Sequence, residues 1–425
     1  MPERAEQVSI SIDGKRFWGW SGLSMTRGID IFSHASFVVP FEPDNAEFRR
    51  VFRPFTFREI TIDVGDERVF TGVMFVNPEL AVTSRQVKID AYAAPAVLQD
   101  AYLPPSSFPL EFRGLNLQQV AEALCRPFGL SVAFQAEIPP VSPAVLAARR
   151  RRRQAQLRVG EIEQAREEFI RKQRLSDESS TGPSITQKAA LETLDQMQAF
   201  AEANLASARI PYAAPAPDAP FRRVRVKPDQ RPFEVLAELA KQRNVVINDM
   251  ADGTLRFWQS QKASSPVARF VEGEPPMEAP AVRVQPQAYY SEITGLARTG
   301  ATRDGSRYTV RNPHLSGVVR PFTFVAEDSE APDLPAATRA KLGRMLGNAI
   351  TFEVPLPTWR DPRGALWTPN STVSLTAPGV MLYRETELIV STVTLTHDSD
   401  SRRATLGLVL PGAFSGELPE QLPWD

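Results

Sequence analysis

The chain contains 425 residues and carries a formal net charge of −1, from 49 basic and 50 acidic side chains. At about 150 residues per domain this length predicts roughly three domains, and the balanced charge gives no global attraction to nucleic acid or to an anionic membrane. The single cysteine, Cys125, excludes an internal disulfide. The lack of an apolar leader, and of any run of about 18 apolar residues, predicts synthesis in a cytoplasm and no membrane insertion.

Residues 1–100 predict the first of two β-barrel domains. The segment Val8–Ile12 alternates apolar and polar residues and leads into Asp13-Gly14, a dipeptide that suits a tight hairpin turn. We expect residues 17–20 on the return strand. Further alternating runs follow, separated by turn residues, at 59–64, 69–76 and 86–92. Short alternating strands of this kind are typical of a small antiparallel barrel or sandwich.

Residues 101–140 and 221–284 predict one α/β domain that the chain builds in two pieces. In the first piece, residues 116–125 place apolar side chains at helical spacing, which predicts a helix with one buried face. Arg126-Pro127-Phe128-Gly129 ends that helix, because proline cannot continue the hydrogen-bond ladder, and a strand is expected next. The second piece repeats this order with a helix and a β-hairpin, at 232–240, 244–249 and 252–258.

Residues 141–220 separate the two pieces and predict an inserted α-helical hairpin. Ser142-Pro143 suits the start of a charged helix that runs toward Arg174, and a capping box at residues 184–187 suits the start of a second helix. The five arginines Arg149–Arg153 open a segment to Arg174 with ten basic and four acidic side chains. A solvated helix face or a partly disordered arm explains this charge best, and contact with DNA, a tape-measure segment or an acidic partner is the alternative.

Residues 285–415 predict the second β-barrel domain, and residues 416–425 a C-terminal tail. A short amphipathic helix is expected over Thr338–Asn348. The corner Gly364–Asn370 then feeds short β-branched strands, and we expect its Trp367 to be buried as a plug at the barrel mouth. We also expect residues 6–97 and 285–415 to share one topology.

Catalytic, cofactor-binding and metal-binding patterns are scarce, and we predict none of these sites. The three histidines, His34, His314 and His397, lie in unrelated segments without metal-ligand spacing. Cys125 lies on an apolar helix stripe, where a small core side chain is the commoner role than a nucleophile. Solvation on the charged helix explains the acidic pairs at 161/163 and 167/168. Barrel packing is the default role of the tryptophans, Trp18, Trp20, Trp258, Trp359, Trp367 and Trp424.

Several phrases of the sequence, in their order, resemble the baseplate hub proteins of contractile-tailed phages, of the Mu-like tail protein family, which is related to the hub proteins of T-even phages. The phrases are L-x-x-V-A-x-x-L-C-R-P-F-G-L-x-V from Leu117, P-F-E-V-L-A-x-L-A from Pro232, D-G-T-L-x-F from Asp252, R-P-F-T-F from Arg320, G-x-L-W-x-P-N from Gly364, L-I-V-x-x-V from Leu388 and L-x-L-x-x-P-x-x-F from Leu406. The resemblance covers most of the chain outside residues 141–220, for which the family pattern has no equivalent.

The resemblance implies an α+β, mainly β fold with two tube-protein-like antiparallel β-barrel domains and a split α/β domain carrying the inserted hairpin. It implies a structural, non-enzymatic hub without cofactors: a homotrimeric ring that adapts the six-fold tail tube to the three-fold spike and leaves a channel for DNA. Its expected partners are the trimeric spike, tail tube or tube-initiator proteins, other baseplate proteins and the tape measure protein. Its expected location is the virion baseplate, after synthesis in the host bacterial cytoplasm. The alternative is a carbohydrate-binding or peptidoglycan-degrading tail-tip component.

Overall fold

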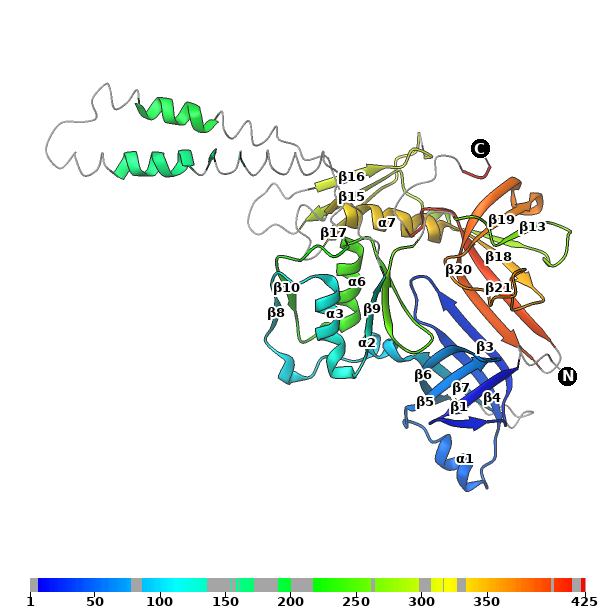
Figure 1. Ribbon diagram of the computed structural model, residues 1–425. Coiled ribbons are helices and arrows are strands. Elements are labelled where there is room, and N and C mark those ends of the chain that lie inside the picture. The colour runs from blue at the N-terminus through cyan, green and yellow to red at the C-terminus, as the bar shows by residue number, and fades with distance from the viewer. Residues whose placement is uncertain are drawn as a thin grey trace. The chain divides into compact units, whose positions relative to one another are not determined.

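A computed structural model describes residues 7–77, 86–135, 154, 158–159, 161–171, 190–199, 217–260, 264–297, 307–315, 317–326, 334–398, 401–414 and 422–424. Contacts divide the chain into two compact units, Met1–Ile138 with Pro215–Asp425, and Pro139–Ala214. The mainly β character predicted from the sequence is confirmed (Figure 1). Within the described ranges, no helix combines the length and the apolar composition that a bilayer crossing requires.

The first set of strands lies in the N-terminal hundred residues. It comprises β1 (Val8–Ile12), β2 (Lys15–Phe17), β3 (Ser21–Gly28), β4 (His34–Pro40), β5 (Arg58–Val64), β6 (Glu67–Asn77) and β7 (Gln86–Ala93), with the short helix α1 (Ala46–Val51) between β4 and β5. Asp13 and Gly14 have positive φ angles of 46° and 74°, as the turn between β1 and β2 requires. The return strand is shorter than predicted, because its pairing with β1 stops at Phe17 and leaves residues 18–20 outside β2.

The sequence had predicted that the second set of strands starts at residue 285. In the structure this set starts earlier, at Ala268. It comprises β13 (Ala268–Val271), β14 (Ala281–Val284), β18 (Ile350–Leu356), β19 (Thr372–Ala377), β20 (Leu382–His397) and β21 (Arg402–Val409). The corner between β18 and β19 contains two residues with positive φ, Gly364 at 85° and Asn370 at 74°. These conformations favour the glycine and asparagine found there.

The same strand order recurs in both sets. Neighbouring strands follow the order β3-β4-β7-β6-β5-β1 in the first set and β14-β18-β21-β20-β19-β13 in the second. In each set, three consecutive strands form an antiparallel meander, and the last of them pairs with the strand that precedes the meander. One difference is that β1 is antiparallel to β5, whereas β13 is parallel to β19.

The two sets join into one 13-stranded sheet, in which β3 pairs antiparallel with β20. The prediction of two β-barrels is therefore wrong in one respect, because the described strands do not close on themselves. Alternation of apolar and polar residues indicates which face of a strand is buried, but it does not say which strand edges meet. The sequence pattern could therefore not separate two closed barrels from one shared open sheet.

The middle region pairs its two sequence pieces with each other. It comprises α2 (Val97–Asp100), β8 (Leu110–Phe112), α3 (Leu117–Cys125), β9 (Val132–Gln135), β10 (Val224–Val226), α6 (Pro232–Gln242), β11 (Val246–Asp249) and β12 (Leu255–Trp258). Strand β9 is parallel to β12, β8 is antiparallel to β10, and α3 packs against α6. Asn116 begins α3 with a capping box to Gln119, and Gly129 after the helix has a φ of 67°.

A smaller sheet follows β14 in the chain and packs against a long helix. It comprises β15 (Glu292–Ala297), β16 (Arg307–Arg311) and β17 (Pro321–Ala326), and the helix is α7 (Leu334–Ala349), which includes the predicted segment 338–348. Helix α7 also packs against α6 and β18. Single 3-10 turns lie at residues 94–96, 105–107, 126–128, 286–288 and 378–380.

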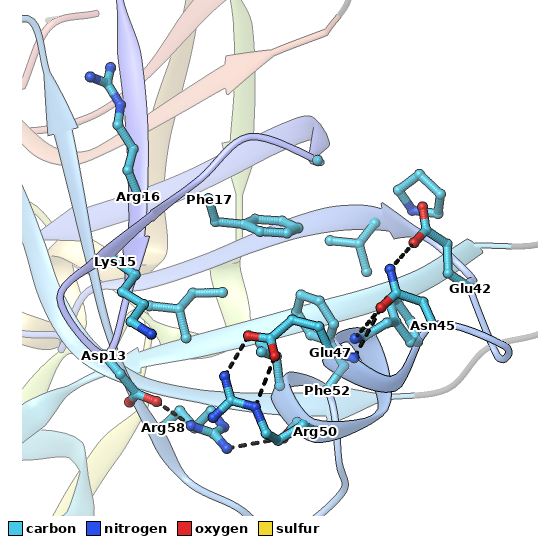
Figure 2. Close-up of a pocket in the computed structure, with 16 residues that line it drawn as sticks. Asp13, Lys15, Arg16, Phe17, Glu42, Asn45, Glu47, Arg50, Phe52 and Arg58 are labelled. Carbon is cyan, nitrogen blue, oxygen red and sulfur yellow. Dashed lines mark hydrogen bonds and ion pairs between the residues drawn. The ribbon is translucent and has the colours of Figure 1, made fainter.

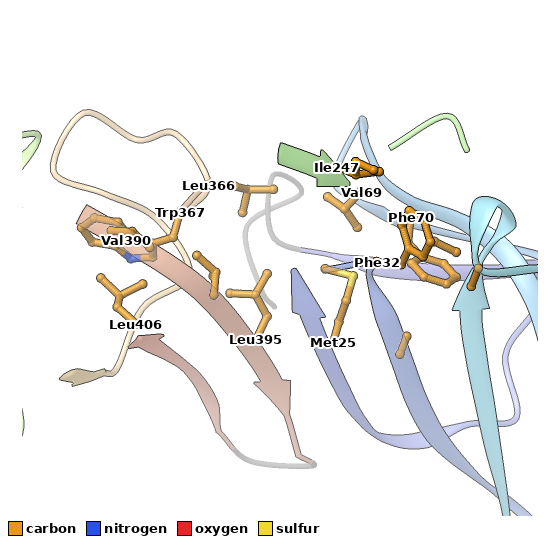
Figure 3. Close-up of a cluster of buried hydrophobic side chains, with 14 of the residues drawn as sticks. Met25, Phe32, Val69, Phe70, Ile247, Leu366, Trp367, Val390, Leu395 and Leu406 are labelled. Atoms are coloured by element: carbon orange, nitrogen blue, oxygen red, sulfur yellow. The ribbon is translucent and has the colours of Figure 1, made fainter. Parts of the chain in front are cut away.

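Buried apolar side chains form one cluster that extends through both strand sets and the middle region. Figure 3 shows Met25 and Leu395 within it, and these two residues are paired across the junction of β3 and β20. Trp367 is 2% exposed, and its ring centroid lies 6.0 Å from that of Phe270. The predicted burial of this indole is therefore confirmed.

The unit Pro139–Ala214 contains most of the segment 141–220 that was predicted as an inserted hairpin. Residues 161–171 and 190–199 are helical, and Arg166 Nε donates to Asp195 Oδ1 over 2.8 Å. Glu161 and its acidic neighbours lie on the first of these helices. The Arg149–Arg153 run and the predicted connector at 175–183 lie outside the described residues.

Candidate functional site

The junction between the two strand sets is the first candidate for a functional surface. Six residue pairs join β3 to β20, from Thr392 opposite Gly28 to His397 opposite Leu23. On the outer side of this pairing, the hydroxyls of Thr26 and Thr394 lie 3.0 Å apart. The segment after β3 continues the contact. Its Ile29 N–H donates to the Ser391 carbonyl over 3.0 Å.

Asp30 ties this junction to the middle region and to α7. Its carboxylate accepts from the Ile247 backbone N–H at 3.1 Å and from Arg344 Nε at 2.8 Å. Nearby, Asn248 Nδ2 donates to the Gly28 carbonyl over 2.9 Å. Both hydrogen bonds to the middle region come from β11, so this strand fixes the end of β3.

Charged side chains surround the buried Asp249, next to β3. Asp249 accepts from the Ser33 backbone N–H at 2.6 Å. Burial raises the pKa of Asp249, and the hydrogen bonds from Ser33 and the charge of Arg27 oppose that rise. Burial likewise lowers the pKa of Arg27 and of Arg256. Sequence analysis missed these residues, although Asp249 lies two positions after the apolar run 245–247. Asp249 is 9% exposed and its carboxylate is held by a backbone N–H, so it suits a fixed joint better than proton transfer to a substrate.

A pocket of about 420 Å³ lies between α1 and the β1–β2 hairpin (Figure 2). Arginines engage its carboxylates: Arg50 pairs with Glu47, and Arg58 pairs with Asp13. The hydrogen bond from Arg50 lowers the pKa of Glu47. A carboxylate held ionised beside a guanidinium is a poor general acid. This pocket therefore shows no acid-base pair poised for catalysis.

The histidines and the cysteine lie apart from one another. Burial lowers the pKa of His34 on β4, and the negative charge of Asp90 partly offsets this lowering. The His397 ring packs edge-on against Trp20 and Trp359. Cys125 is fully buried in α3, and burial raises the pKa of its thiol to about 12. Across the described parts of the chain, no three His, Cys, Asp or Glu side chains are grouped as metal ligands.

The tryptophans differ in exposure. Trp258, Trp359 and Trp367 are each at most 8% exposed, and Trp20 packs against the core. Trp18 is 64% exposed, but the Arg16 guanidinium stacks over its ring at 4.1 Å. Most of these indoles therefore serve packing, and the stacked guanidinium already occupies one face of Trp18.

An exposed aromatic groove of about 440 Å³ lies on the outer face of the first strand set. Phe57, Phe75 and Tyr92 form a row in it, with neighbouring ring centroids 5.2 and 5.4 Å apart. Phe57 is 57% and Tyr92 is 47% exposed. Tyr92 lies between the buried Ala91 and Ala93, so strand alternation directs it away from the core. That alternation was the sequence signal for this groove, and exposed apolar surfaces of this kind mark contacts with other molecules.

No family model matches the chain. Its sequence is similar to "Baseplate hub protein gp44" of Escherichia phage Mu, at 23% identity over 416 residues that cover 94% of this chain and 87% of that protein. A solved structure with the same fold is the 43 kDa tail protein of prophage MuSo2 from Shewanella oneidensis, with a TM-score of 0.65 and 20% identity over 96% of this chain and 100% of that one.

A second solved structure is the tail protein from Neisseria meningitidis MC58, with a TM-score of 0.64 and 14% identity over 96% of this chain and 98% of that one. The resemblance predicted from the sequence is confirmed by these matches. The chain is similar over nearly its whole length to a Mu baseplate hub protein, and it has the fold of a prophage tail protein and of a second bacterial tail protein.

Proposed function

We propose that this protein is a structural baseplate hub protein of a contractile phage tail. The observation that carries the proposal is the similarity to the Mu baseplate hub protein over 94% of the chain. The site geometry agrees with a non-enzymatic role. The buried carboxylate of Asp249 accepts a backbone hydrogen bond from Ser33, and an exposed apolar groove lies on a sheet face, where contacts between proteins form.

The repeated strand order supports a homotrimer that adapts symmetry. Each copy contains two strand sets of the same order, so three copies place six similar sets in a ring. Such a ring matches a six-fold tail tube on one side and a three-fold spike on the other. A central channel would let DNA pass in transit, without specific binding.

The expected partners follow from this position in the virion. They are the tail tube or tube-initiator proteins, the trimeric spike, other baseplate proteins and the tape measure protein. The protein would be made in the host bacterial cytoplasm and would reach the tail tip by assembly. The domain limits predicted from the sequence stay a proposal: 1–100, 101–140 with 221–284, 141–220, 285–415 and 416–425. The second strand set adds β13 and β14, within residues 268–284, to the last β domain.

Mass measurement and electron microscopy test the proposal. Purified protein, alone or mixed with the spike of the same phage, should have the mass of three copies. Images of tail tips should place it between the tube and the spike. A protein that stays monomeric in both conditions, or that binds glycans and is absent from the tail tip, would contradict the hub and favour a carbohydrate-binding component.

A further inference from the structure

Strand β14 is an edge strand that exposes apolar side chains on its core face. Among the described strands it pairs only with β18. Val284 lies opposite the buried Ile350, and Val282 lies opposite the buried Phe352. Directly opposite residues share one face of a sheet, so both valines lie on the core face. They are nevertheless 60% and 38% exposed, because nothing in the described chain covers the second edge of β14.

Strand β6 has a second edge that the described chain also leaves open. Its pairing with β5 ends where Met74 lies opposite Arg58. Residues Phe75–Asn77 continue to pair with β7 on the other side. On the β5 side, the described strands provide no partner for this segment. An unpaired strand edge is a template for another strand.

Strand β20 is the counterpart of β6, and in β20 the equivalent edge is paired with another strand. Its pairing with β19 ends where Ile389 lies opposite Thr372. Residues Thr392–His397 then pair with β3, while β21 occupies the opposite edge. Strand β3 is the first strand of its set, as β14 is of the other. The junction inside one copy therefore joins the outer strand of one set to the middle strand of the meander of the other.

Residues that lie opposite one another on the core face set the register of the comparison. The matching rows across the two sets are Met25, Ala35, Ala91, Met74 in the first and Val282, Phe352, Leu408, Val390 in the second. With these rows superposed, Arg283 takes the place of Thr26, and Asn77 takes the place of Thr394. Thr26 and Thr394 are directly paired in the junction, with hydroxyls 3.0 Å apart.

The exposed aromatic groove has a covered counterpart in the second strand set. Beside β20 and β21 a cavity of about 360 Å³ is lined by Ile29 and Ile31, which directly follow β3. Ile29 is 1% exposed and covers part of this cavity, whereas Ile31 is 39% exposed. The equivalent groove beside β6 and β7 contains the exposed Phe57 and Tyr92. The segment that follows β14 would cover it in the same way.

We propose that β14 of one copy pairs antiparallel with Phe75–Asn77 of β6 in a second copy, with Arg283 opposite Asn77. The residues that follow β14 then lie over the aromatic groove. The contact is head-to-tail, because the two copies contribute different surfaces, and repetition of a head-to-tail contact can close a ring. The inference deepens the proposed function by naming the surfaces between copies, but it rests on the strand pairing within one chain.

Substitution of an exposed edge residue tests the contact. Val284→Glu should weaken self-association at least about tenfold, because it places a charge in an apolar interface. Val284 is 60% exposed in the single chain, so the variant should keep its fold, which circular dichroism checks. Val318→Glu is the matched control, since Val318 is a 50% exposed valine outside both proposed surfaces. Equal association of the two variants would overturn the proposal.

Cysteine cross-linking tests the direction and register of the contact. Directly opposite positions in an antiparallel pair have the Cα separation that a disulfide needs. Arg283→Cys and Asn77→Cys should each fail to cross-link alone, whereas a mixture of the two should give covalent dimers on oxidation. The native Cys125 should not interfere, because it is fully buried. Cross-linking of Arg283→Cys with itself would indicate pairing of two β14 strands and would overturn the head-to-tail contact.

The copy number separates failure of this interface from failure of the hub. If the protein has the mass of three copies, and Val284→Glu and the cysteine mixture behave like their controls, the interface is wrong and the hub proposal stands. If the protein is monomeric with and without the spike, the hub proposal fails. A mixture that still cross-links in that case would support the interface on its own.

Discussion

Two buried tryptophans in one corner of the fold have different surroundings, which leads to different predictions. Trp359 Nε1 donates to the carbonyls of Thr396 and Arg403, over 3.1 and 2.9 Å. Trp367 Nε1 is buried without a hydrogen-bond partner among the described residues. We expect Trp367→Ala to lower the free energy of unfolding by about 3–5 kcal/mol, as large aromatic truncations in cores do. Urea denaturation followed by circular dichroism measures this.

The matched control is replacement of each indole by phenylalanine. Trp367→Phe should recover most of the stability, because no hydrogen bond is lost. Trp359→Phe should cost about 1–3 kcal/mol, because two carbonyls lose their shared donor. Equal costs for the two phenylalanine variants would contradict this interpretation. A Trp367→Ala variant that unfolds like the wild type would show that its ring does not support the corner.

At the scale of elements, one glutamate helps to hold the two pieces of the middle region together. Glu111 on β8 accepts from Arg223, beside β10, and from Arg113, each over 2.5 Å. These hydrogen bonds lower the pKa of Glu111 to about 2. Because the folded-state pKa is depressed, the stabilisation is present above the ordinary value of about 4.3 and is lost as the pH falls toward 2.

Glu111→Gln should therefore be less stable than the wild type at pH 7, and the difference should shrink as the pH falls from about 4.3 toward 2. The effect should be small, because the pair is exposed to solvent, and added salt should reduce it further. Denaturation midpoints of both proteins at pH 7 and pH 3 measure the difference. A difference that grows on acidification would have the wrong sign for this mechanism.

At the scale of the whole molecule, the unit Pro139–Ala214 should be dispensable for folding of the rest. The flanking pieces hold each other through the pairs β9 with β12 and β8 with β10. We expect replacement of residues 139–214 by a Gly/Ser linker to leave a soluble protein with unchanged assembly mass. A defect should appear only in attachment to other baseplate proteins or in infectivity. Mass measurement and thermal unfolding test the folding half of this prediction.

A slightly longer deletion provides the control. Phe221 is 5% exposed, and its backbone forms hydrogen bonds with Leu115 and Gly114. Removing residues 139–221 should therefore destabilise the protein, although it takes away only seven residues more than the first deletion. Aggregation of the shorter deletion would show that the inserted unit belongs to the core.

Sequence patterns were sufficient where the decisive interactions are local. The helix at α3 was predictable because its apolar spacing, its cap at Asn116 and its stop at Gly129 lie within one short segment. The same holds for the turn at Asp13-Gly14, whose positive φ angles favour these residue types. The order of the family-like phrases was also sufficient to predict the resemblance to a phage hub protein.

The tertiary structure alone decided how distant strands share their edges. The sequence patterns predicted strands after the Gly364–Asn370 corner, where Leu395 lies, but they did not predict β3, which contains Met25. Nothing local indicates that β3 pairs with β20 rather than closing its own set. The charges of Arg27 and Asp249 likewise meet only after residues more than two hundred positions apart are brought together. Backbone hydrogen bonding is the same for every strand edge, so the pairing of edges depends on the packing of the complete sheet. The sequence by itself therefore determined the helices, turns and strands whose signals are local, whereas the junction, the open edges of β6 and β14, and the candidate interface between copies depended on the fold.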